Sequence, residues 1–473
     1  MSIRVVETEL LGTTIRTRMP FRYGIATLTE VPHLVVRLSA EIDGKVHVGY
    51  AADNLAPKWF TKDPEQSYED ERKSMLDVIN SAKTIGEDIG TFDTVFDWWR
   101  ELYSRQKQWG TERGIPALLW NFGATLIERA AIDACCRAAG MPFARVVKTN
   151  KLGMDLAELH PDFAAIGLGD IIAPEPLQTV ALRHTIGLTD PLADDEIPAD
   201  EILHDGLPQS LQQCISFYNL KYFKIKISGS VDADLDRLRR IARIIVRERK
   251  NDYYFTLDGN EQFTQISTLF DFWDQLHKDP VLKDFFSRMI VLEQPFHRDI
   301  SLSDDIAKDL LAWNDRPPMI IDESDSTFES LRRALECGYS GTSHKNCKGI
   351  FKSFFNAALL ESHRRAHPGH DVIMTAEDLT SIGPISLNQD LAMVSLLGID
   401  HVERNGHHYF NGIGFFNEQL QKQTVEAHGD LYESKSGLTR LQINNGFLRI
   451  GSVVNAPFGC NLDPDLSGLS RFD

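Results

Sequence analysis

Eight short apolar runs occur between residues 180 and 405, and amphipathic helical stretches lie between most of them. The clearest of these stretches is 232–249, where apolar side chains recur at helical spacing among arginines and aspartates. This alternation is typical of a parallel (β/α) barrel, because consecutive parallel strands are joined by crossover helices. A doubly wound open sheet is the alternative, but it usually has a glycine-rich phosphate-binding turn, and the sequence contains none. We therefore predict the α/β class with a (β/α)7-8 TIM-type barrel.

The segments on either side of the barrel stretch have a different pattern. The first 145 residues read as α+β, with alternating strands joined by a turn at Asp43-Gly44 and followed by long helical patterns. After residue 415 the pattern is mixed, and we expect this tail to fold back over the first segment. The predicted domains are an α+β N-terminal capping domain (1–145, completed by 416–473) and a barrel catalytic domain (146–415) with insertions near 147–180 and 189–215.

Composition restricts the partners that the chain can have. The 473 residues carry a net charge of −18, which argues against nucleic acid or an anionic membrane as a partner. The N-terminal stretch MSIRVVETELLGTT has no hydrophobic signal core, and the six cysteines show no C-x-x-C spacing. We expect a cytoplasmic protein that acts on a small molecule.

Carboxylates end three consecutive strands of the predicted barrel. Asp258 follows FTL, Glu293 follows IVL and Asp322 follows MII. The C-terminal ends of barrel strands meet at one face, where three converging carboxylates would repel one another unless they shared a hard divalent cation. Oxygen ligands at an open site suit Mg²⁺, with Mn²⁺ as a possible substitute. The alternative, that each acid only caps its strand, is favoured for one acid alone but not for three in succession.

Lysines flank these acids in the strand order. In FKIKISGS, Lys224 and Lys226 share one face of a strand, and the two like charges are expected to lower the pKa of one of them enough to make a base near neutrality. The sixth strand brings Lys345 to the mouth from the other side, although its register relative to Lys348 is open. Lysines on two sides of a divalent metal suit proton abstraction next to a carboxylate.

This order of K-x-K, Asp258, Glu293 and the DES that begins at Asp322 resembles the enolase superfamily, most closely its muconate-lactonizing and mandelate-racemase-like branch. PFRYG and HLVVRLSAEIDG resemble the capping domain of that family, and FLRIGSVVNAPFGCNLDPD resembles its return segment. The resemblance implies that Lys226 is the base, that Lys224 tunes it and binds the substrate carboxylate, and that the three acids hold Mg²⁺. It also matches Lys345 to the strand-six lysine of the muconate-lactonizing branch.

Several residues are candidates for substrate contact. The sequence departs from the mandelate-racemase pattern in strand seven, which lacks the histidine and reads TAEDLTSIGP, while strand eight reads HVERNGHHYF. The predicted set consists of polar residues at these strand ends, residues after strands three and five that would support the metal ligands, and two residues of the capping domain that would close over the barrel mouth. Its members are Tyr23, Trp59, Asn260, Glu323, Glu377, Asp378, Glu403 and Arg404.

The resemblance implies a Mg²⁺-dependent enzyme that abstracts the α-proton of a small carboxylate substrate through an enediolate. The polar end of strand eight favours a hydroxy-acid or sugar-acid dehydratase, a lyase. The alternatives are an isomerase (a racemase, an epimerase or a cycloisomerase of the muconate-lactonizing type) and a non-catalytic metal-binding barrel. We also expect a homo-oligomer.

Overall fold

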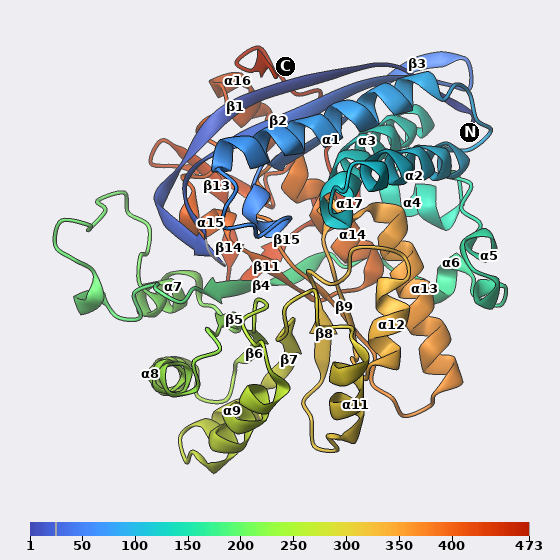
Figure 1. Ribbon diagram of the computed structural model, residues 1–473. Helices are drawn as coiled ribbons and strands as arrows, with labels where there is room; N and C mark the ends of the chain where they lie inside the picture. Colours follow the sequence, from blue (N-terminus) through green and yellow to red (C-terminus); the bar gives the residue numbers. More distant parts are fainter. Residues whose placement is uncertain (24–25, 473) are drawn as a thin grey trace.

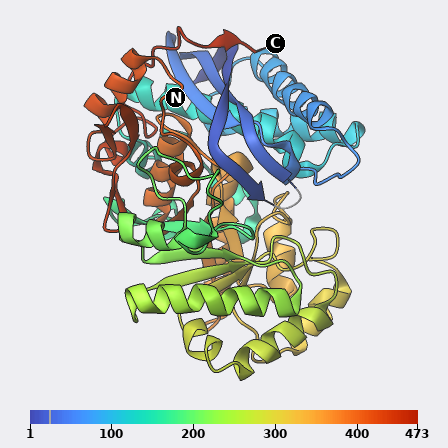
Figure 2. The ribbon, with the colours of Figure 1, turned by 90° about the vertical axis from the view of Figure 1, so that its left-hand side faces the viewer.

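The computed structural model describes residues 1–23 and 26–472. An antiparallel sheet with three long helices lies over a barrel of parallel strands, and the chain ends beside the first sheet (Figures 1 and 2). None of the helices in the described ranges has the length and apolarity needed to span a bilayer.

The N-terminal sheet has the order β16-β1-β2-β3, with β1 (Ile3–Tyr23), β2 (Ala26–Ile42), β3 (Lys45–Asn54) and the short β16 (Ser470–Arg471). Asp43 and Gly44 both have positive φ, 47° and 81°, which is the mirror-image turn that suits the twist of a hairpin. The predicted turn is therefore present.

Three helices cover this sheet: α1 (Tyr68–Asp88), α2 (Val95–Glu112) and α3 (Ala117–Ala139). Helix α3 is buried on all sides from Leu118 to Cys136 and ends at Gly140, whose φ of 59° is left-handed. A Cβ on Gly49 of β3 would lie 2.1 Å from the Ala130 carbonyl oxygen, so the absence of a side chain lets the sheet press against α3. Helix α3 thus sits between the sheet and the barrel.

The barrel is formed by eight parallel strands, and all eight predicted apolar runs contribute one. Each pairs with the next from β4 to β10, and β11 pairs with β4; in the described chain no ladder joins β10 to β11. The strands are β4 (Thr179–Ile186), β5 (Tyr222–Lys226), β6 (Tyr254–Asp258), β7 (Met289–Glu293), β8 (Met319–Ile321), β9 (Gly341–His344), β10 (Ile373–Ala376) and β11 (His401–Arg404). This confirms the predicted α/β barrel with an α+β cap.

Helices surround the barrel in chain order. They are α7 (Leu211–Tyr218), α8 (Val231–Arg249), α9 (Ile266–Lys278), α10 (Leu282–Phe286), α11 (Asp304–Ala312), α12 (Ser330–Glu336), α13 (Ile350–Ala366), α14 (Ser386–Leu397) and the single turn α15 (Gly406–Tyr409). The chain before β4 holds α4 (Phe143–Lys148), α5 (Leu156–Leu159), η2 (Pro161–Phe163) and α6 (Leu168–Ile171). The long connection from β4 to α7 contains η3 (Asp194–Glu196) and projects at the left of Figure 1.

The tail contacts both parts of the molecule. It contains α16 (Glu418–Ala427), β12 (Tyr432–Lys435), β13 (Leu438–Leu441), β14 (Ile443–Asn444), β15 (Phe447–Arg449) and α17 (Gly451–Val454). Strand β15 pairs antiparallel with β4 of the barrel, whereas β16 pairs with β1 of the N-terminal sheet. The tail therefore packs on both parts: Leu420 belongs to a cluster with Ile15 and Val31 of the N-terminal sheet, and Cys460 packs with Val35 and Ala52 of that sheet.

Candidate active site

Strand register places the charged residues side by side at the C-terminal end of the barrel. Lys226 of β5 pairs with Asp258 of β6, and Asp258 pairs with Glu293 of β7. Asp322 and Lys345 directly follow β8 and β9. All five side chains are buried. The sequence order of the strands therefore becomes a spatial order around one mouth.

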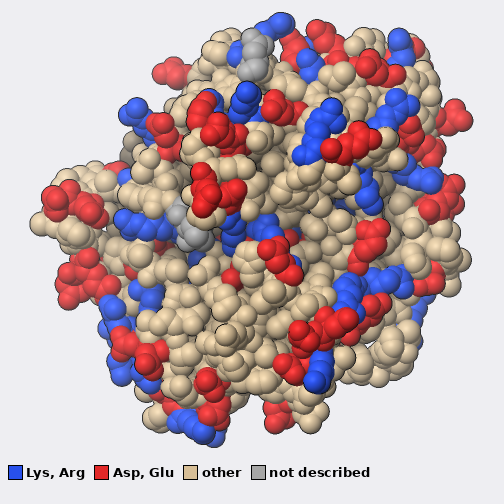
Figure 3. All heavy atoms as spheres, viewed as in Figure 1, with Lys and Arg blue, Asp and Glu red and all other residues tan. Residues whose placement is uncertain are grey.

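A small cavity of about 40 Å³ lies at this mouth. From the barrel it is lined by Lys224, Lys226, Asp258, Asn260, Asp322, Lys345, Asp378, Leu379, Thr380, Glu403 and Asn405; from the N-terminal segment, by Phe21, Ala56 and Trp59. The charges on the outer surface are arranged differently from those of the cavity. On the face shown in Figure 3, Lys/Arg and Asp/Glu are interspersed without a large patch of one sign. The charge that matters for a substrate is therefore that of the buried mouth.

Lys224 lies among four carboxylates. Its Nζ is 3.2 Å from Asp258 Oδ2, 2.8 Å from Glu293 Oε2, 2.9 Å from Glu377 Oε2 and 3.2 Å from Glu403 Oε2. Burial disfavours the ammonium, but the carboxylates outweigh it and hold the pKa of Lys224 well above its usual value. The prediction that like-charge repulsion would lower a lysine pKa here is wrong for Lys224, because four acids surround it.

Lys226 has a different environment. The contact that the structure gives its Nζ is with Asp258 Oδ2 at 3.6 Å, and the side chain lines the cavity. Both lysines line the cavity, but Lys224 is held among four carboxylates, whereas Lys226 contacts only Asp258 among the described acids.

On the other side of the mouth, Asp322 contacts two lysines. Lys345 Nζ lies 2.6 Å from Asp322 Oδ2, and Lys348 Nζ lies 2.9 Å from Asp322 Oδ1. Lys345 lines the cavity and its Nζ is 4.4 Å from the centre of the Trp59 ring, whereas Lys348 donates to the carbonyl and hydroxyl oxygens of Ser343. The open register of the sixth strand is thereby answered in favour of Lys345. The Asp322 carboxylate outweighs the effect of burial and raises the pKa of Lys345.

The three acids fit a hard divalent cation by donor type, burial and position. The Lys224 ammonium already bridges Asp258 and Glu293, which shows that positive charge is held between two of them. Burial, followed by the nearby Glu377, raises the pKa of Glu293 well above its usual value. Additional positive charge beside Glu293 would stabilise its ionised form. The described oxygens of Asp258, Glu293 and Asp322 do not all lie within 4.8 Å of one another.

The predicted substrate contacts divide into two groups. Trp59, Asn260, Asp378 and Glu403 line the cavity. Burial raises the pKa of Asp378 to about 6. Tyr23 ends β1, but its side chain lies outside the part of the chain that the structure describes.

Three predicted contacts do not line the cavity, and each has a structural partner. Glu323 accepts a hydrogen bond from Asn260 Nδ2 at 3.1 Å, so it supports a lining residue. Glu377 binds Arg183 and Lys224 inside the barrel. Arg404 binds Asp390 of α14, because successive strand residues point to opposite faces and its neighbour Glu403 points inward. In this structure the three side chains bind other protein groups instead of lining the cavity, and their direct contact with a substrate stays a prediction.

Sequence reasoning missed the residues that hold segment 57–62, the lid segment beside the cavity, in place. Arg298 Nη1 donates to the Phe60 carbonyl at 2.8 Å and its Nη2 to the Trp59 carbonyl at 3.0 Å. Both Arg298 and Lys62 form ion pairs with Glu261. Lys58, the residue before Trp59, pairs with Glu71. No local pattern marked Arg298, because the two carbonyls that it holds, those of Trp59 and Phe60, lie more than two hundred residues away in the sequence.

Neither a protein-family model nor a curated protein matches the sequence. Many solved structures match the fold. They include a mandelate racemase/muconate lactonizing protein from Herpetosiphon aurantiacus, which is 14% identical with a TM-score of 0.61 over 97% of this chain and 99% of that one. A muconate lactonizing enzyme from Pseudomonas fluorescens complexed with muconolactone is 14% identical with a TM-score of 0.59 over 99% and 97%.

A dipeptide epimerase from Cytophaga hutchinsonii, complexed with Mg and the dipeptide D-Ala-L-Val, is 15% identical with a TM-score of 0.59 over 99% of both chains. At these identities the similarity establishes the architecture. It confirms, at the level of the fold, the resemblance that the strand-end motifs indicated. The chain has the capped-barrel fold of the mandelate racemase and muconate lactonizing branch of the enolase superfamily.

Proposed function

We propose that this protein is a Mg²⁺-dependent enzyme that removes the proton α to a carboxylate. The observation that carries the proposal is the cavity at the barrel mouth, which Lys226 and Lys345 border together with Asp258 and Asp322. Lysines from two strands beside carboxylates give a substrate acid both a proton acceptor and a counter-charge.

Each residue has a proposed role. Lys226 accepts the α-proton, since it borders the cavity and is less enclosed by acids than Lys224. Lys345 approaches from β9 and returns a proton or delivers one to a leaving group. Asp258, Glu293 and Asp322 would hold Mg²⁺, which would offset the negative charge that develops on the substrate carboxylate. Trp59 covers the mouth and keeps water out.

Within this class we propose dehydration of a hydroxy acid or sugar acid. Asp378, Glu403 and Asn405 make one side of the cavity polar, which suits a substrate that carries hydroxyl groups. Racemisation, epimerisation or cycloisomerisation uses the same two lysines and is the second candidate, favoured by the placement of Lys345. The described similarity to a dipeptide epimerase and a muconate lactonizing enzyme is compatible with it.

The test is α-proton exchange in D₂O with Mg²⁺ over a panel of sugar acids, hydroxy acids and amino-acid derivatives. Exchange followed by loss of water and formation of a keto acid indicates a dehydratase, whereas exchange with inversion indicates a racemase or epimerase. Binding of Mg²⁺ without exchange of any panel member would favour a non-catalytic metal-binding barrel.

A further inference from the structure

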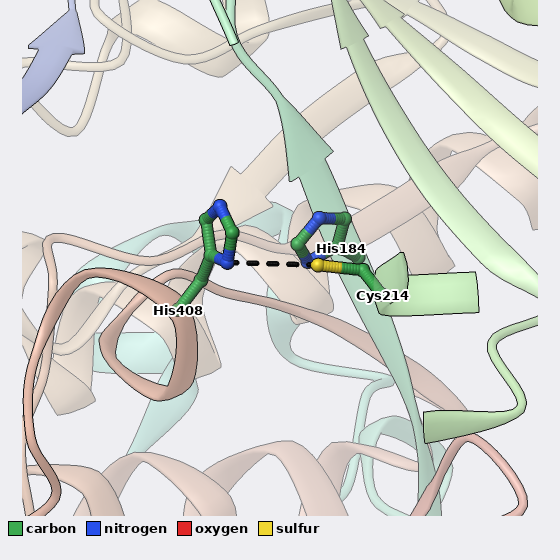
Figure 4. A group of neighbouring side chains, drawn as sticks. All are labelled: His184, Cys214 and His408. Carbon is green, nitrogen blue, oxygen red and sulfur yellow. Dashed lines mark hydrogen bonds between the residues drawn. The ribbon is translucent and has the colours of Figure 1, made fainter. Parts of the chain in front are cut away.

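A second cluster of metal-binding side chains lies away from the barrel mouth. His184 of β4, Cys214 of α7 and His408 of α15 are all buried, and their ligand atoms lie within 4.8 Å of one another (Figure 4). Within residues 1–23 and 26–472 this is the one group of three or more His, Cys, Asp or Glu residues that meets this distance.

The pleat of β4 separates this cluster from the mouth. Arg183 and Thr185 point into the barrel, where they bond Glu377 and Glu403. His184 lies between them in sequence and therefore points to the outer face, toward α7 and α15. The cluster thus joins three elements: β4 and α7, which lie at the two ends of the long connection, and α15.

The contacts within the cluster leave its donors available. Cys214 Sγ and His408 Nδ1 are 3.6 Å apart, and His184 Nδ1 lies 3.1 Å from His407 Nε2. Among the described residues, the other ring nitrogen of His184, Nε2, makes no hydrogen bond. The Nδ1 atom of His407 is buried and has no hydrogen-bond partner among the described residues. A group of neutral nitrogens and a thiol is therefore only weakly satisfied by its own hydrogen bonds.

The ligand types of the cluster suit a transition metal, because an imidazole nitrogen and a thiolate both bind such ions. The Cys214 thiol would release its proton to become the thiolate ligand.

We infer that His184, Cys214 and His408 form a structural site for a thiolate-binding transition metal, foremost Zn²⁺. Two imidazoles and one thiolate are ligands that Zn²⁺ prefers, and three protein ligands leave a fourth tetrahedral position for water. The site would hold β4, α7 and α15 together, and α15 directly follows Glu403 and Asn405 at the mouth. It needs neither the lysines nor the carboxylates of the proposed reaction.

The test uses Co²⁺ as a spectroscopic substitute for Zn²⁺. The full-length protein is produced in Co²⁺-supplemented minimal medium and purified in excess Mg²⁺, which competes for the carboxylates. We expect one equivalent of Co²⁺ to remain, with a near-ultraviolet thiolate-to-cobalt charge-transfer band and the intense visible bands of tetrahedral Co²⁺. Cys214→Ser should lose both, whereas Cys337→Ser, which alters a buried thiol on α12's C-terminal side, should keep both.

The wild-type spectrum decides the matter even if Cys214→Ser fails to fold. Wild-type protein that retains no Co²⁺, or that retains it without a thiolate band, would overturn the proposal. A band that survives in Cys214→Ser would overturn it too. His408→Gln provides a second variant, with at least a tenfold faster loss of metal to a chelator expected.

Discussion

Lys224 and Lys226 are two residues apart on one strand face, yet their surroundings give them different roles. Lys224 is enclosed by Asp258, Glu293, Glu377 and Glu403, and the network keeps it charged. Removing one member of a buried ion network leaves uncompensated charge, which costs more than the network itself contributes.

Lys224→Met should therefore destabilise the fold by about 3–5 kcal/mol at neutral pH without Mg²⁺. The reason is repulsion among four buried acids, and the loss should shrink when Mg²⁺ is added. Urea denaturation measures both effects. Lys221→Met, which removes a partly exposed lysine paired with Asp252, is the matched control and should cost no more than about 1 kcal/mol. Equal stability of the Lys224 variant and wild type would contradict the account.

Glu293→Gln should weaken Mg²⁺ binding, because it replaces a charged oxygen donor by a neutral amide. We expect at least a tenfold rise in the dissociation constant, measured by calorimetry on the purified variant. Glu248→Gln on the outer face of α8 should leave the affinity unchanged. Wild-type affinity in Glu293→Gln would remove Glu293 from the proposed metal ligands.

At the scale of elements, the first turn of α13 is tied to α3 by a buried acid. The amides of Ile350 and Phe351 donate to Glu128 Oε1 at 2.9 and 2.8 Å. Burial raises the pKa of Glu128 to about 8 in spite of these bonds. The folded state therefore retains a proton that the unfolded chain releases near pH 4.5.

The contribution of the Glu128 carboxyl to the free energy of unfolding is therefore fully present below pH 4.5 and is lost as pH rises to about 8. Between these two pH values the loss is up to ~1.4 kcal/mol per pH unit. Glu128→Gln keeps the accepting oxygen and removes the titration. Relative to wild type, the variant should gain stability between pH 5 and pH 8, measured by urea denaturation at several pH values. Exposed Glu112→Gln should show no such gain. Parallel pH profiles of wild type and Glu128→Gln would count against the account.

The lid segment 57–62 is a second element-scale feature. Arg298 holds the carbonyls of Trp59 and Phe60 and is itself held by Glu261. Arg298→Ala should loosen the segment, with at least a tenfold faster amide exchange in the peptide that covers it, followed by hydrogen–deuterium exchange mass spectrometry. Arg288→Ala, which removes a guanidinium near the Tyr254 ring, should leave that peptide unchanged. Unaltered exchange in Arg298→Ala would show that other contacts fix the lid.

Local signals located the barrel strands and the acids and lysines that end them. Apolar runs and the polar residue after each run are local properties, so Asp258, Glu293 and Asp322 could be placed on consecutive strands from sequence alone. Sequence could not show that Arg404 turns outward to Asp390, since that depends on the pleat. Nor could it foresee that Arg183 would meet Glu377, 194 residues further on.

At the scale of the whole molecule, the tail also makes contacts between distant parts of the chain that the sequence alone could not predict. Its mixed pattern predicted a return to the N-terminal segment, and Leu420 and Cys460 do pack against that sheet, but β15 also adds to the barrel beside β4. Such pairing depends on an edge that exists only in the folded barrel. The cavity arises in the same way, because Phe21 and Trp59 come from one segment and the charged residues from another.

The central claim is that Lys226 takes an α-proton within this capped barrel. It is tested most directly by α-proton exchange in D₂O with Mg²⁺ and the substrate that the panel identifies. Lys226→Ala should lose exchange by about 10²–10⁴-fold while its fold and Mg²⁺ affinity persist. Lys221→Ala should match wild type. Exchange at the wild-type rate in Lys226→Ala would contradict the account and show that another group is the base.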